Sequence, residues 1–333
     1  MISFSQVSMR AVAALVVGMV VAAWVSSESM LSLLTQATIY AVFATGVGVL
    51  LRQNGAASFG HALFFGGAGY GVAVLLKLQV VTGEWAIVLT LAGMTLAAFL
   101  IGLVIVRVPG IAFGMVTLAI GQMAFLSMSR ARGFLGGADG LSVDWPAQLF
   151  GVSQSELFKP ATMFLVSWVT LVVILAVLAL VLSRRFGSVT EAVRDNEERA
   201  RFIGISTLIP RASIYAVSAL ISGMGGMLAA LHSGFVSPES LHWSLSGMTL
   251  MMVIVGGVKT LWGPAIGAAT YFLFKDYVGD FATHWMSIFG VVLIAVIVFA
   301  PYGVAGLLTR LLGRRRGTTV QKSAMSSVRG SLQ

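Results

Sequence analysis

The chain contains no cysteine, and only 10% of its 333 residues are charged. The absence of cysteine excludes disulfide bonds and thiol chemistry. The scarcity of charge is more informative, because a soluble domain carries about a quarter charged residues, whereas 58% of this chain is hydrophobic. So little polar surface cannot cover a water-soluble particle. The composition therefore predicts a membrane protein whose main partner is the lipid bilayer.

Two further classes of site are not expected. The four histidines are scattered along the chain at positions 61, 232, 242 and 284, a spacing that does not favour a metal site. The net charge of +9 is not arranged as a basic stripe with interleaved aromatic residues, so we do not expect a nucleic-acid partner. We predict no metal and no cofactor.

Membrane spans need about 20 predominantly apolar residues each, and ten stretches are candidates. The first follows Arg10, and no small-residue cleavage motif follows it cleanly, so we expect a retained helix instead of a signal peptide. Some of the later stretches are short and contain glycine. The expected fold is an all-α polytopic membrane protein with about 8–10 transmembrane helices and Gly-interrupted spans. The candidates are residues 11–25, 30–51, 60–77, 85–106, 109–128, 161–182, 211–231, 244–257, 263–279 and 285–300.

Positive charge predicts the orientation. If the N-terminus is cytoplasmic and the spans alternate, sixteen Lys and Arg residues lie on the cytoplasmic side and five on the other, which obeys the positive-inside rule. We therefore expect both termini and the loop 184–211 in the cytoplasm, and the loop 129–160 outside. Residues 1–309 would form the transmembrane domain, and residues 310–333 a basic cytoplasmic tail without a fold of its own.

Acidic residues are absent from the middle of every candidate span, since all twelve lie at span ends or in loops. An ion-coupled carrier usually buries a carboxylate in its pathway, so proton or ion coupling is not expected. No nucleophile–base or paired-acid constellation indicates an enzyme. The stretch "GGVKT" (256–260) departs from a phosphate-binding loop, because Val258 interrupts the Gly-Lys-Thr order. If the protein uses ATP, another chain must bind it.

The stretch 188–210, "SVTEAVRDNEERARFIGISTLIP", concentrates the charge of this apolar chain. Ser188 and Glu191 have the spacing of a capping box, and Gly204 is a natural helix stop. Three pairs of oppositely charged residues are spaced four positions apart, at 194/198, 195/199 and 197/201. The pattern predicts one short helix over 189–203. It is either a solvated connector or a docking helix for a cytoplasmic protein.

A motif in this stretch favours docking. Glu198, Ala200 and Gly204 match E-x-A-x-x-x-G, and Ile209 and Pro210 follow. The arrangement resembles the loop by which permeases of ABC importers engage their ATPases, although Arg199 replaces the usual alanine. The resemblance implies a set of ATPase-coupling residues, namely Glu191, Glu197, Glu198, Ala200, Gly204 and Pro210.

Other motifs extend this resemblance over roughly residues 30–305. "GAASFGHALFFGGAGY" (55–70) and "GGADGL" (136–141) resemble motifs of the branched-chain amino-acid permeases, as do "SGFVSPES" (233–240) and "VIVGGVKTLWGPAIGAA" (253–269). The order is that of the LivM-like subunit of this ABC transporter family. The resemblance implies a bacterial inner-membrane importer of branched-chain amino acids. Its implied partners are a LivH-like second permease, two ATP-binding subunits and a periplasmic substrate-binding protein.

Two positions depart from the family. "AFGMVTLAIGQMAFL" (112–126) resembles a span in which Gln122 is usually Glu and Phe125 is often Arg. Loss of both members of a compensated pair is either neutral drift or a sign of a different substrate. Relatives of this architecture carry urea, short amides or small aromatic acids, so these remain alternatives. A stand-alone secondary carrier or facilitator is the alternative from another class.

A substrate pathway needs polar partners in the membrane, and interrupted helices expose backbone N–H and C=O groups there. Glycines in the third span and between the eighth and ninth spans could interrupt those helices, or could serve only close helix packing. His61 is expected either to hydrogen-bond across a helix break or to be a satisfied structural histidine. The candidate pathway residues are Asn54, Ser58, Gly60, His61, Gly67, Tyr70, Thr117, Gln122, Gly263 and Pro264.

Overall fold

The computed structural model describes residues 4–79, 81–144, 146–279, 281–282, 284–300, 302–307 and 309. The tail 310–333 lies outside the described residues. The helices and strands are α1 (Phe4–Trp24), α2 (Glu28–Asn54), α3 (Ala62–Leu78), α4 (Gly83–Ile105), α5 (Gly110–Arg130), α6 (Arg132–Leu135), η1 (Gly137–Asp139), β1 (Leu141–Ser142), β2 (Gln148–Leu149), β3 (Val152–Ser153), α7 (Gln154–Leu157), α8 (Pro160–Leu182), α9 (Arg185–Asp195), α10 (Glu197–Phe202), α11 (Leu208–Ser233), β4 (Phe235–Val236), η2 (Pro238–Leu241), α12 (Trp243–Gly256), α13 (Gly263–Gly279) and α14 (Trp285–Phe299).

The predicted all-α polytopic fold is confirmed. Each of the ten apolar stretches is a helix. Among the described residues, six helices are long and apolar enough to cross a membrane, namely α1, α2, α4, α5, α8 and α11, while α3, α12 and α14 are shorter apolar helices. Hydropathy predicts these segments well because every backbone polar group must be bonded within a helix when lipid surrounds it.

The helices α2 and α11 form the centre of the bundle, and both are mostly buried. They pack against each other; α3 and α4 cover α11, whereas α8 and α13 cover α2. The helix α1 lies against α8, where the indole Nε1 of Trp168 donates a hydrogen bond to the carbonyl oxygen of Ala14 at 2.9 Å. The limits of α2 follow from its sequence, since Ser27 caps its first turn and Gly55, at φ 67°, ends it.

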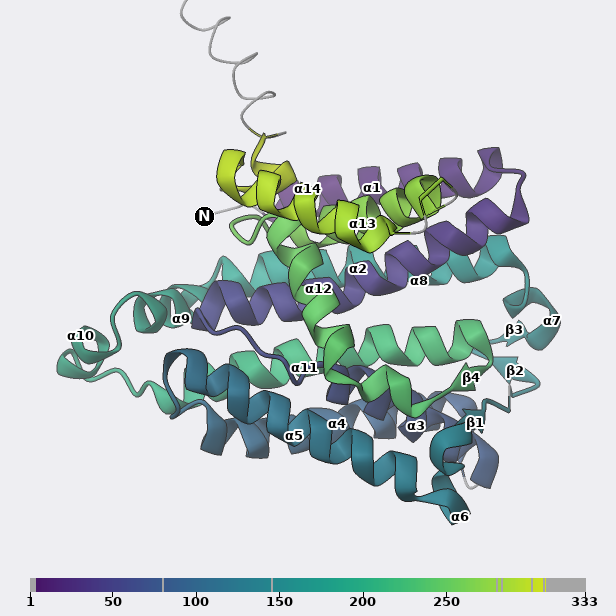
Figure 1. Ribbon diagram of the computed structural model, residues 1–333, viewed down its shortest axis with the longest axis horizontal. Helices are drawn as coiled ribbons and strands as arrows, with labels where there is room; N and C mark the ends of the chain where they lie inside the picture. Colours follow the sequence, from purple (N-terminus) through teal and green to yellow (C-terminus); the bar gives the residue numbers. More distant parts are fainter. Residues whose placement is uncertain are drawn as a thin grey trace, which may run out of the picture.

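The connecting segments gather at two opposite ends of the bundle (Figure 1). The helices α9 and α10 project at the left end of this view, where the described chain also begins. The helices α6 and α7 and the short strands lie at the right end. There β1 pairs with β4, which joins the segment after α5 to the segment after α11. Which end faces the cytoplasm stays a prediction.

The charged stretch differs from its prediction, because it forms two helices instead of one. Asn196 is extended, at φ −159° and ψ 101°, and separates α9 from α10. Its side-chain oxygen accepts a hydrogen bond from the backbone N–H of Arg199 at 2.8 Å. Asparagine is among the best N-cap residues, and this cap starts a new helix where charge spacing suggests continuity. The predicted capping box is also wrong, since Ser188 lies inside α9 and bonds to carbonyl oxygens of its own helix.

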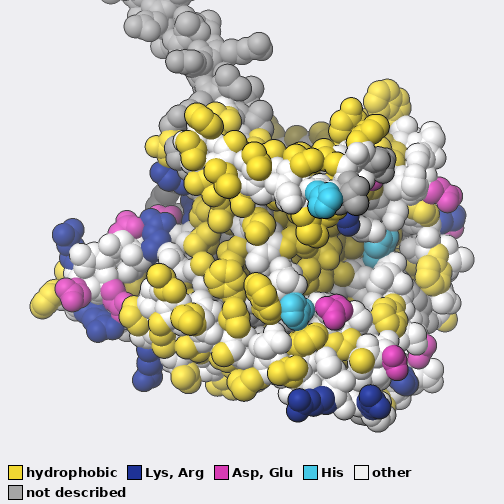
Figure 2. All heavy atoms as spheres, viewed as in Figure 1, with side chains coloured by type: hydrophobic (Ala, Val, Ile, Leu, Met, Phe, Trp, Pro, Cys, Tyr) yellow, Lys and Arg dark blue, Asp and Glu magenta, His cyan; other side chains and the backbone are white. Residues whose placement is uncertain are grey.

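The surface has charged regions at the two ends of the bundle and an apolar region between them. Figure 2 shows charged side chains gathered over α9 and α10 at the left, and again at the lower right, with hydrophobic side chains covering the hollowed face between them. This distribution is that of a protein whose middle lies in lipid or against another membrane chain, with its two ends in water.

Candidate functional site

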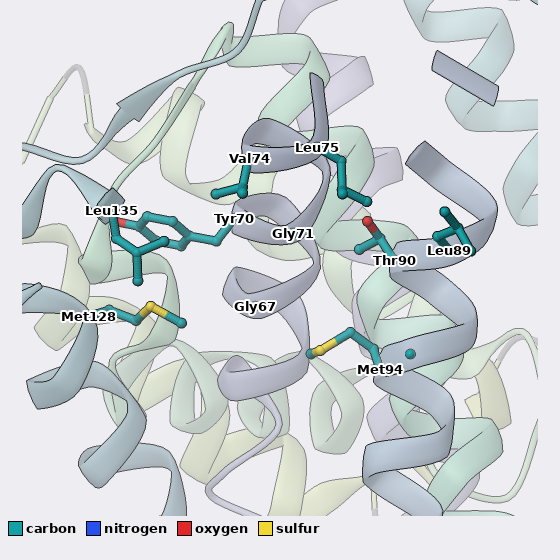
Figure 3. A pocket seen from close by; sticks show the side chains of 11 residues that line it. Gly67, Tyr70, Gly71, Val74, Leu75, Leu89, Thr90, Met94, Met128 and Leu135 are labelled. Atoms are coloured by element: carbon teal, nitrogen blue, oxygen red, sulfur yellow. The ribbon is translucent and has the colours of Figure 1, made fainter. Parts of the chain in front are cut away.

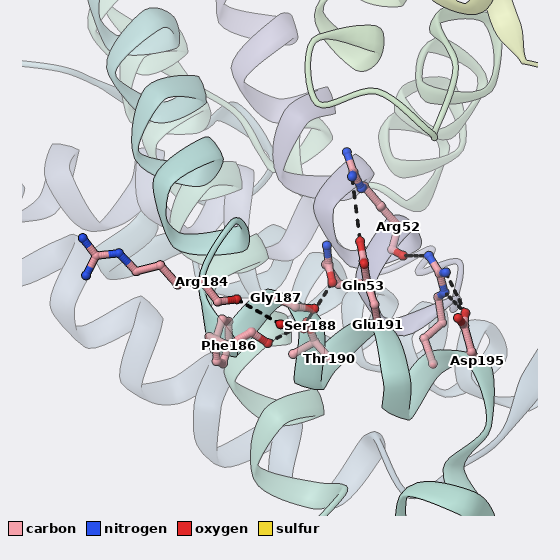
Figure 4. A network of polar contacts seen from close by, with 10 residues as sticks. Arg52, Gln53, Arg184, Phe186, Gly187, Ser188, Thr190, Glu191 and Asp195 are labelled. Carbon is pink, nitrogen blue, oxygen red and sulfur yellow. Dashed lines mark hydrogen bonds and ion pairs between the residues drawn. The ribbon is translucent and has the colours of Figure 1, made fainter. Parts of the chain in front are cut away.

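The C-terminal end of α2 is bound to α9 by long-range polar contacts (Figure 4). The Thr190 hydroxyl donates to the side-chain oxygen of Gln53 at 2.7 Å, and both side chains are almost fully buried. The guanidinium of Arg194 donates to the carbonyl oxygen of Arg52 at 2.6 Å, and Arg52 approaches Glu191 at 3.8 Å. The helix α9 is therefore fixed to the end of a central membrane helix.

The helix α10 is bound instead to α11. One carboxylate oxygen of Glu197 lies 2.6 Å from a guanidinium nitrogen of Arg201 and accepts from the Thr207 hydroxyl at 3.0 Å. The other oxygen lies 2.8 Å from the guanidinium of Arg211, in the first turns of α11. Of the three charge pairs expected from sequence spacing, 197/201 is confirmed. Arg194 pairs with its neighbour Asp195 instead of residue 198, because Asn196 breaks the helical spacing.

The end of α10 presents an apolar tip. Gly204 has φ 82°. Its backbone N–H donates to the carbonyl oxygen of Arg201, and the N–H of Ile205 donates to the carbonyl oxygen of Ala200. This is a Schellman arrangement that ends the helix as predicted. Before it, the side chains of Phe202 and Ile203 are 89% and 71% exposed.

The predicted coupling residues therefore separate into two groups. Glu191 and Glu197 hold the loop to the bundle, and Ala200 is buried. Glu198 and Gly204 are exposed, while Pro210 lies half-buried in the first turn of α11. The sequence interpretation missed Phe202, although an aromatic residue within a charged stretch was the available signal.

A second cluster is centred on His61, which is fully buried at the start of α3. Its Nδ1 lies 2.7 Å from the Ser58 hydroxyl, and its Nε2 lies 2.7 Å from the Ser218 hydroxyl on α11. Ser218 in turn donates to the carbonyl oxygen of Gly46. Because that hydroxyl has only one proton, Nε2–H donates to Ser218, and Nδ1 accepts from Ser58. A neutral His61 thus satisfies both neighbours. Because Ser58 lies in the non-helical segment before α3 and Ser218 lies on α11, these bonds fit both expectations for His61, a bond across a helix break and a satisfied structural histidine.

The segment before His61 is non-helical and lies against α5. The N–H of Phe59 donates to the Thr117 hydroxyl at 3.2 Å. A Cβ on Gly60 would collide with the carbonyl oxygen of Thr117. The structure therefore brings four of the predicted pathway residues together: Ser58, Gly60, His61 and Thr117.

Gln122 lies one turn further along α5. Its side-chain oxygen is buried, and it has no hydrogen-bond partner among the described residues. Phe125 packs edge-on against the ring of His242, with 5.0 Å between the ring centroids. The apolar ring thus fills a place beside η2 and the start of α12, so the side chain at position 125 offers no charge to pair with position 122.

Gly67 and Tyr70 lie apart from this cluster, on a cavity of about 370 Å³ between α3, α4 and the α5–α6 region. Figure 3 shows the Tyr70 ring pointing toward Leu135 and Met128, with Met94 and Thr90 on the α4 side. The lining is almost entirely apolar, yet the buried Tyr70 hydroxyl has no partner in the described part of the chain. A solute with an aliphatic body and one polar group suits such a lining.

The remaining predicted residues lie elsewhere. Gly263 and Pro264 are buried where α13 begins, and a Cβ on Gly263 would collide with the carbonyl oxygen of Gly257. This glycine allows backbone segments to touch, as in close helix packing. Asn54 lies at the end of α2, where its amide donates to the carbonyl oxygen of Arg211 at 3.0 Å.

Comparison with known proteins identifies relatives over most of the chain. A family model described as the permease component of the branched-chain amino acid transport system matches residues 29–301. The high-affinity branched-chain amino acid transport system permease protein LivM of Salmonella typhimurium is 26% identical, over 84% of this chain and 70% of the relative. The LivM protein of Escherichia coli is 25% identical, over 90% of this chain and 75% of the relative.

A relative with another named role is also similar. The autoinducer 2 import system permease protein LsrC of Yersinia pestis is 24% identical, over 59% of this chain and 50% of the relative. No solved structure matches the chain.

Proposed function

Because this chain belongs to the family of branched-chain amino acid transport system permease components, we propose that it is the LivM-like subunit of an ABC importer in a bacterial inner membrane. In this proposal it carries branched-chain amino acids inward with a LivH-like permease. Two ATP-binding subunits supply the energy, and a periplasmic protein delivers the substrate. The chain itself is a permease subunit and not an enzyme.

The observation that carries the coupling part of this proposal is the anchoring of α9 and α10. Thr190, Arg194 and Glu197 fix these two helices to the ends of α2 and α11, which are the two central helices. A partner that moves α10 would therefore also move the central helix α11, because Glu197 of α10 forms an ion pair with Arg211 of α11. The exposed Phe202 and Ile203 supply an apolar tip of the kind that anchors protein–protein contacts.

We propose that the substrate pathway runs beside α3 and α5. The apolar cavity beside Tyr70 would receive the aliphatic side chain of the substrate. The Tyr70 hydroxyl, which has no partner among the residues that the structure describes, would bond one of the substrate's polar groups. Replacing Tyr70 with Phe should raise the KM for leucine uptake several-fold. The matched variant Leu75→Met keeps the apolar lining of the same cavity and should change the KM little. Equal KM values in both variants would remove Tyr70 from the pathway.

A second candidate is the same architecture with a different small polar substrate, such as urea, a short amide or a small aromatic acid. It is favoured by Gln122 and Phe125, which stand where the family usually has a charged pair. An uncharged amide offers both a donor and an acceptor, so it can serve a neutral solute as well as a zwitterion.

Uptake by the complete transporter distinguishes these candidates. Cells that express the chain with the proposed partner subunits are assayed with labelled leucine, urea, a short amide and benzoate. Saturable leucine uptake that depends on ATP supports the first candidate, whereas uptake of only another solute supports the second. If Gln122→Glu changes neither rate nor range, position 122 does not select the substrate. Uptake that needs no ATPase would contradict both candidates and indicate a facilitator.

A further inference from the structure

A cavity of about 340 Å³ lies beside the Glu197 cluster, at the ends of two membrane helices. It is distinct from the Tyr70 cavity, and none of the predicted pathway residues lines it. Three elements form it: the end of α4, the helix α10 and the start of α11. Its lining consists of Val106, Arg107, Glu197, Arg201, Thr207, Leu208 and Arg211.

The charge of this lining is unbalanced. Three guanidinium groups, those of Arg107, Arg201 and Arg211, face a single carboxylate, so the lining carries three positive charges against one negative. Glu197 already pairs with Arg201 and Arg211. The Arg107 side chain has no carboxylate partner among the described residues, and its Nε donates to the carbonyl oxygen of Leu103 at 3.1 Å.

The start of α11 adds to this positive character. The first backbone N–H groups of a helix lack partners within it and carry a partial positive charge. Thr207 precedes this helix, but its side chain does not cap it, because the hydroxyl donates to Glu197. An oxygen-rich anion in the cavity would meet guanidinium donors and the positive end of a long helix together.

We propose that this cavity binds the phosphate of an anionic phospholipid head group. Guanidinium groups recognise phosphate oxygens with paired hydrogen bonds, and basic pockets between membrane helices suit anionic head groups. The position favours a lipid over a free anion. Arg107 follows the last turn of the membrane helix α4, and the apolar Val106 and Leu208 share the lining, so acyl chains can continue along the helices. The basic charge comes from three elements of the fold, not from α10 alone.

The site can be tested on the purified full chain, apart from transport. Native mass spectrometry measures how much phosphatidylglycerol the detergent-solubilised permease retains, compared with phosphatidylcholine. Arg107→Gln is the first variant, since this residue pairs with no carboxylate in the described part of the chain and the change breaks no ion pair there. Arg199→Gln is the matched control, because it removes the same charge from exposed α10 without touching the cavity. Each lining arginine removed should lower phosphatidylglycerol retention about fivefold, and the double variant Arg107→Gln with Arg201→Gln should lower it further.

Three results would overturn the proposal. The first is an equal loss in Arg199→Gln, which would mean that general surface charge retains the lipid. The second is full displacement of phosphatidylglycerol by inorganic phosphate, which would make the ligand a soluble anion. The third is unchanged lipid retention in Arg107→Gln while co-purified ATPase subunits are lost, which would assign the cavity to a protein partner. Because lipid retention is measured without substrate or ATP, failure of this proposal is distinguishable from failure of the transport function.

Discussion

The Thr190 hydroxyl donates a hydrogen bond to the side-chain oxygen of Gln53 at 2.7 Å, across 137 positions of sequence. Thr190 is 2% exposed and Gln53 is 1% exposed, so water cannot replace either partner. This bond joins the loop proposed to meet the ATPases to the last turn of a central membrane helix. It is the most enclosed polar contact between the two.

Replacing Thr190 with Val should weaken this joint while keeping the shape of the side chain. The same hydroxyl also lies within hydrogen-bond distance of the carbonyl oxygens of Phe186 and Gly187 in α9, but those are helix carbonyls, whereas the Gln53 oxygen would be left buried without this donor, which costs roughly 1–3 kcal/mol. We expect a lower melting temperature of the purified permease, and more ATP hydrolysed per substrate in the reconstituted complex.

Ser188→Ala is the control for Thr190→Val. Ser188 lies two residues earlier in α9, and among the described residues its hydroxyl bonds to the carbonyl oxygens of Arg184 and Arg185 at the start of that helix. It should leave both the melting temperature and the coupling ratio unchanged. Identical behaviour of the two variants would show that the Thr190–Gln53 bond does not transmit motion.

Loss of His61 should destabilise the protein from its centre. His61→Ala removes the group that joins Ser58 to Ser218, and leaves two hydroxyls and a void in a buried site, at a cost of roughly 3 kcal/mol or more. His284→Ala, at an exposed position, should have little effect. Thermal unfolding in detergent compares them, and equal melting temperatures would refute the structural role of His61.

Gly60 and Gly93 test the contact between α5 and the segment before α3. Gly60→Ala places a methyl group against the Thr117 carbonyl oxygen, and such overpacking costs about 1–3 kcal/mol. Gly93→Ala meets nothing within 4 Å, and alanine in a helix is favoured by about 1 kcal/mol. Uptake and melting temperature should both fall in the first variant, whereas the melting temperature should hold in the second, whose uptake is not compared because Gly93 lines the Tyr70 cavity. An unimpaired Gly60→Ala protein would show that the contact is looser than the structure has it.

The membrane helices could be predicted from sequence because hydropathy reports a local property. Each apolar stretch becomes a helix wherever its neighbours lie, and Gly204 ends α10 through its own backbone preference. The break between α9 and α10 at Asn196 was harder to predict from the sequence. The charges of residues 194–201 have the spacing of one continuous helix. This spacing gave no sign that Asn196 would cap a second helix.

The partners of the site residues could not be predicted, since they come from distant segments. His61 meets Ser218, 157 residues away, and Arg194 meets the backbone of Arg52. A single sequence contains no signal for such pairs. That Arg107 lacks a carboxylate partner among the described residues likewise becomes visible only when the ends of α4 and α11 are placed side by side.

The orientation of the chain can be tested with single cysteines, because the chain has none of its own. Ser153 and Ser188 are both exposed and lie on segments at opposite ends of the bundle (Figure 1). A cysteine at 153 should react with an impermeant maleimide added outside intact cells, and one at 188 only after the membrane is opened. The reverse pattern would place α9 and α10 outside and separate them from any ATPase.

The most direct test of the coupling account is whether ATPase subunits stay with the permease when Phe202 is replaced by Ser. Phe202 is 89% exposed, so the change should leave the fold intact, and removing an aromatic anchor from an interface costs about 2 kcal/mol or more. Phe150→Ser, at an exposed position on the opposite end of the bundle, is the control. We expect affinity-purified Phe202→Ser permease to lose its ATPase subunits and uptake, and Phe150→Ser permease to keep both. A Phe202→Ser permease that retains its ATPases and transports normally would contradict the coupling account.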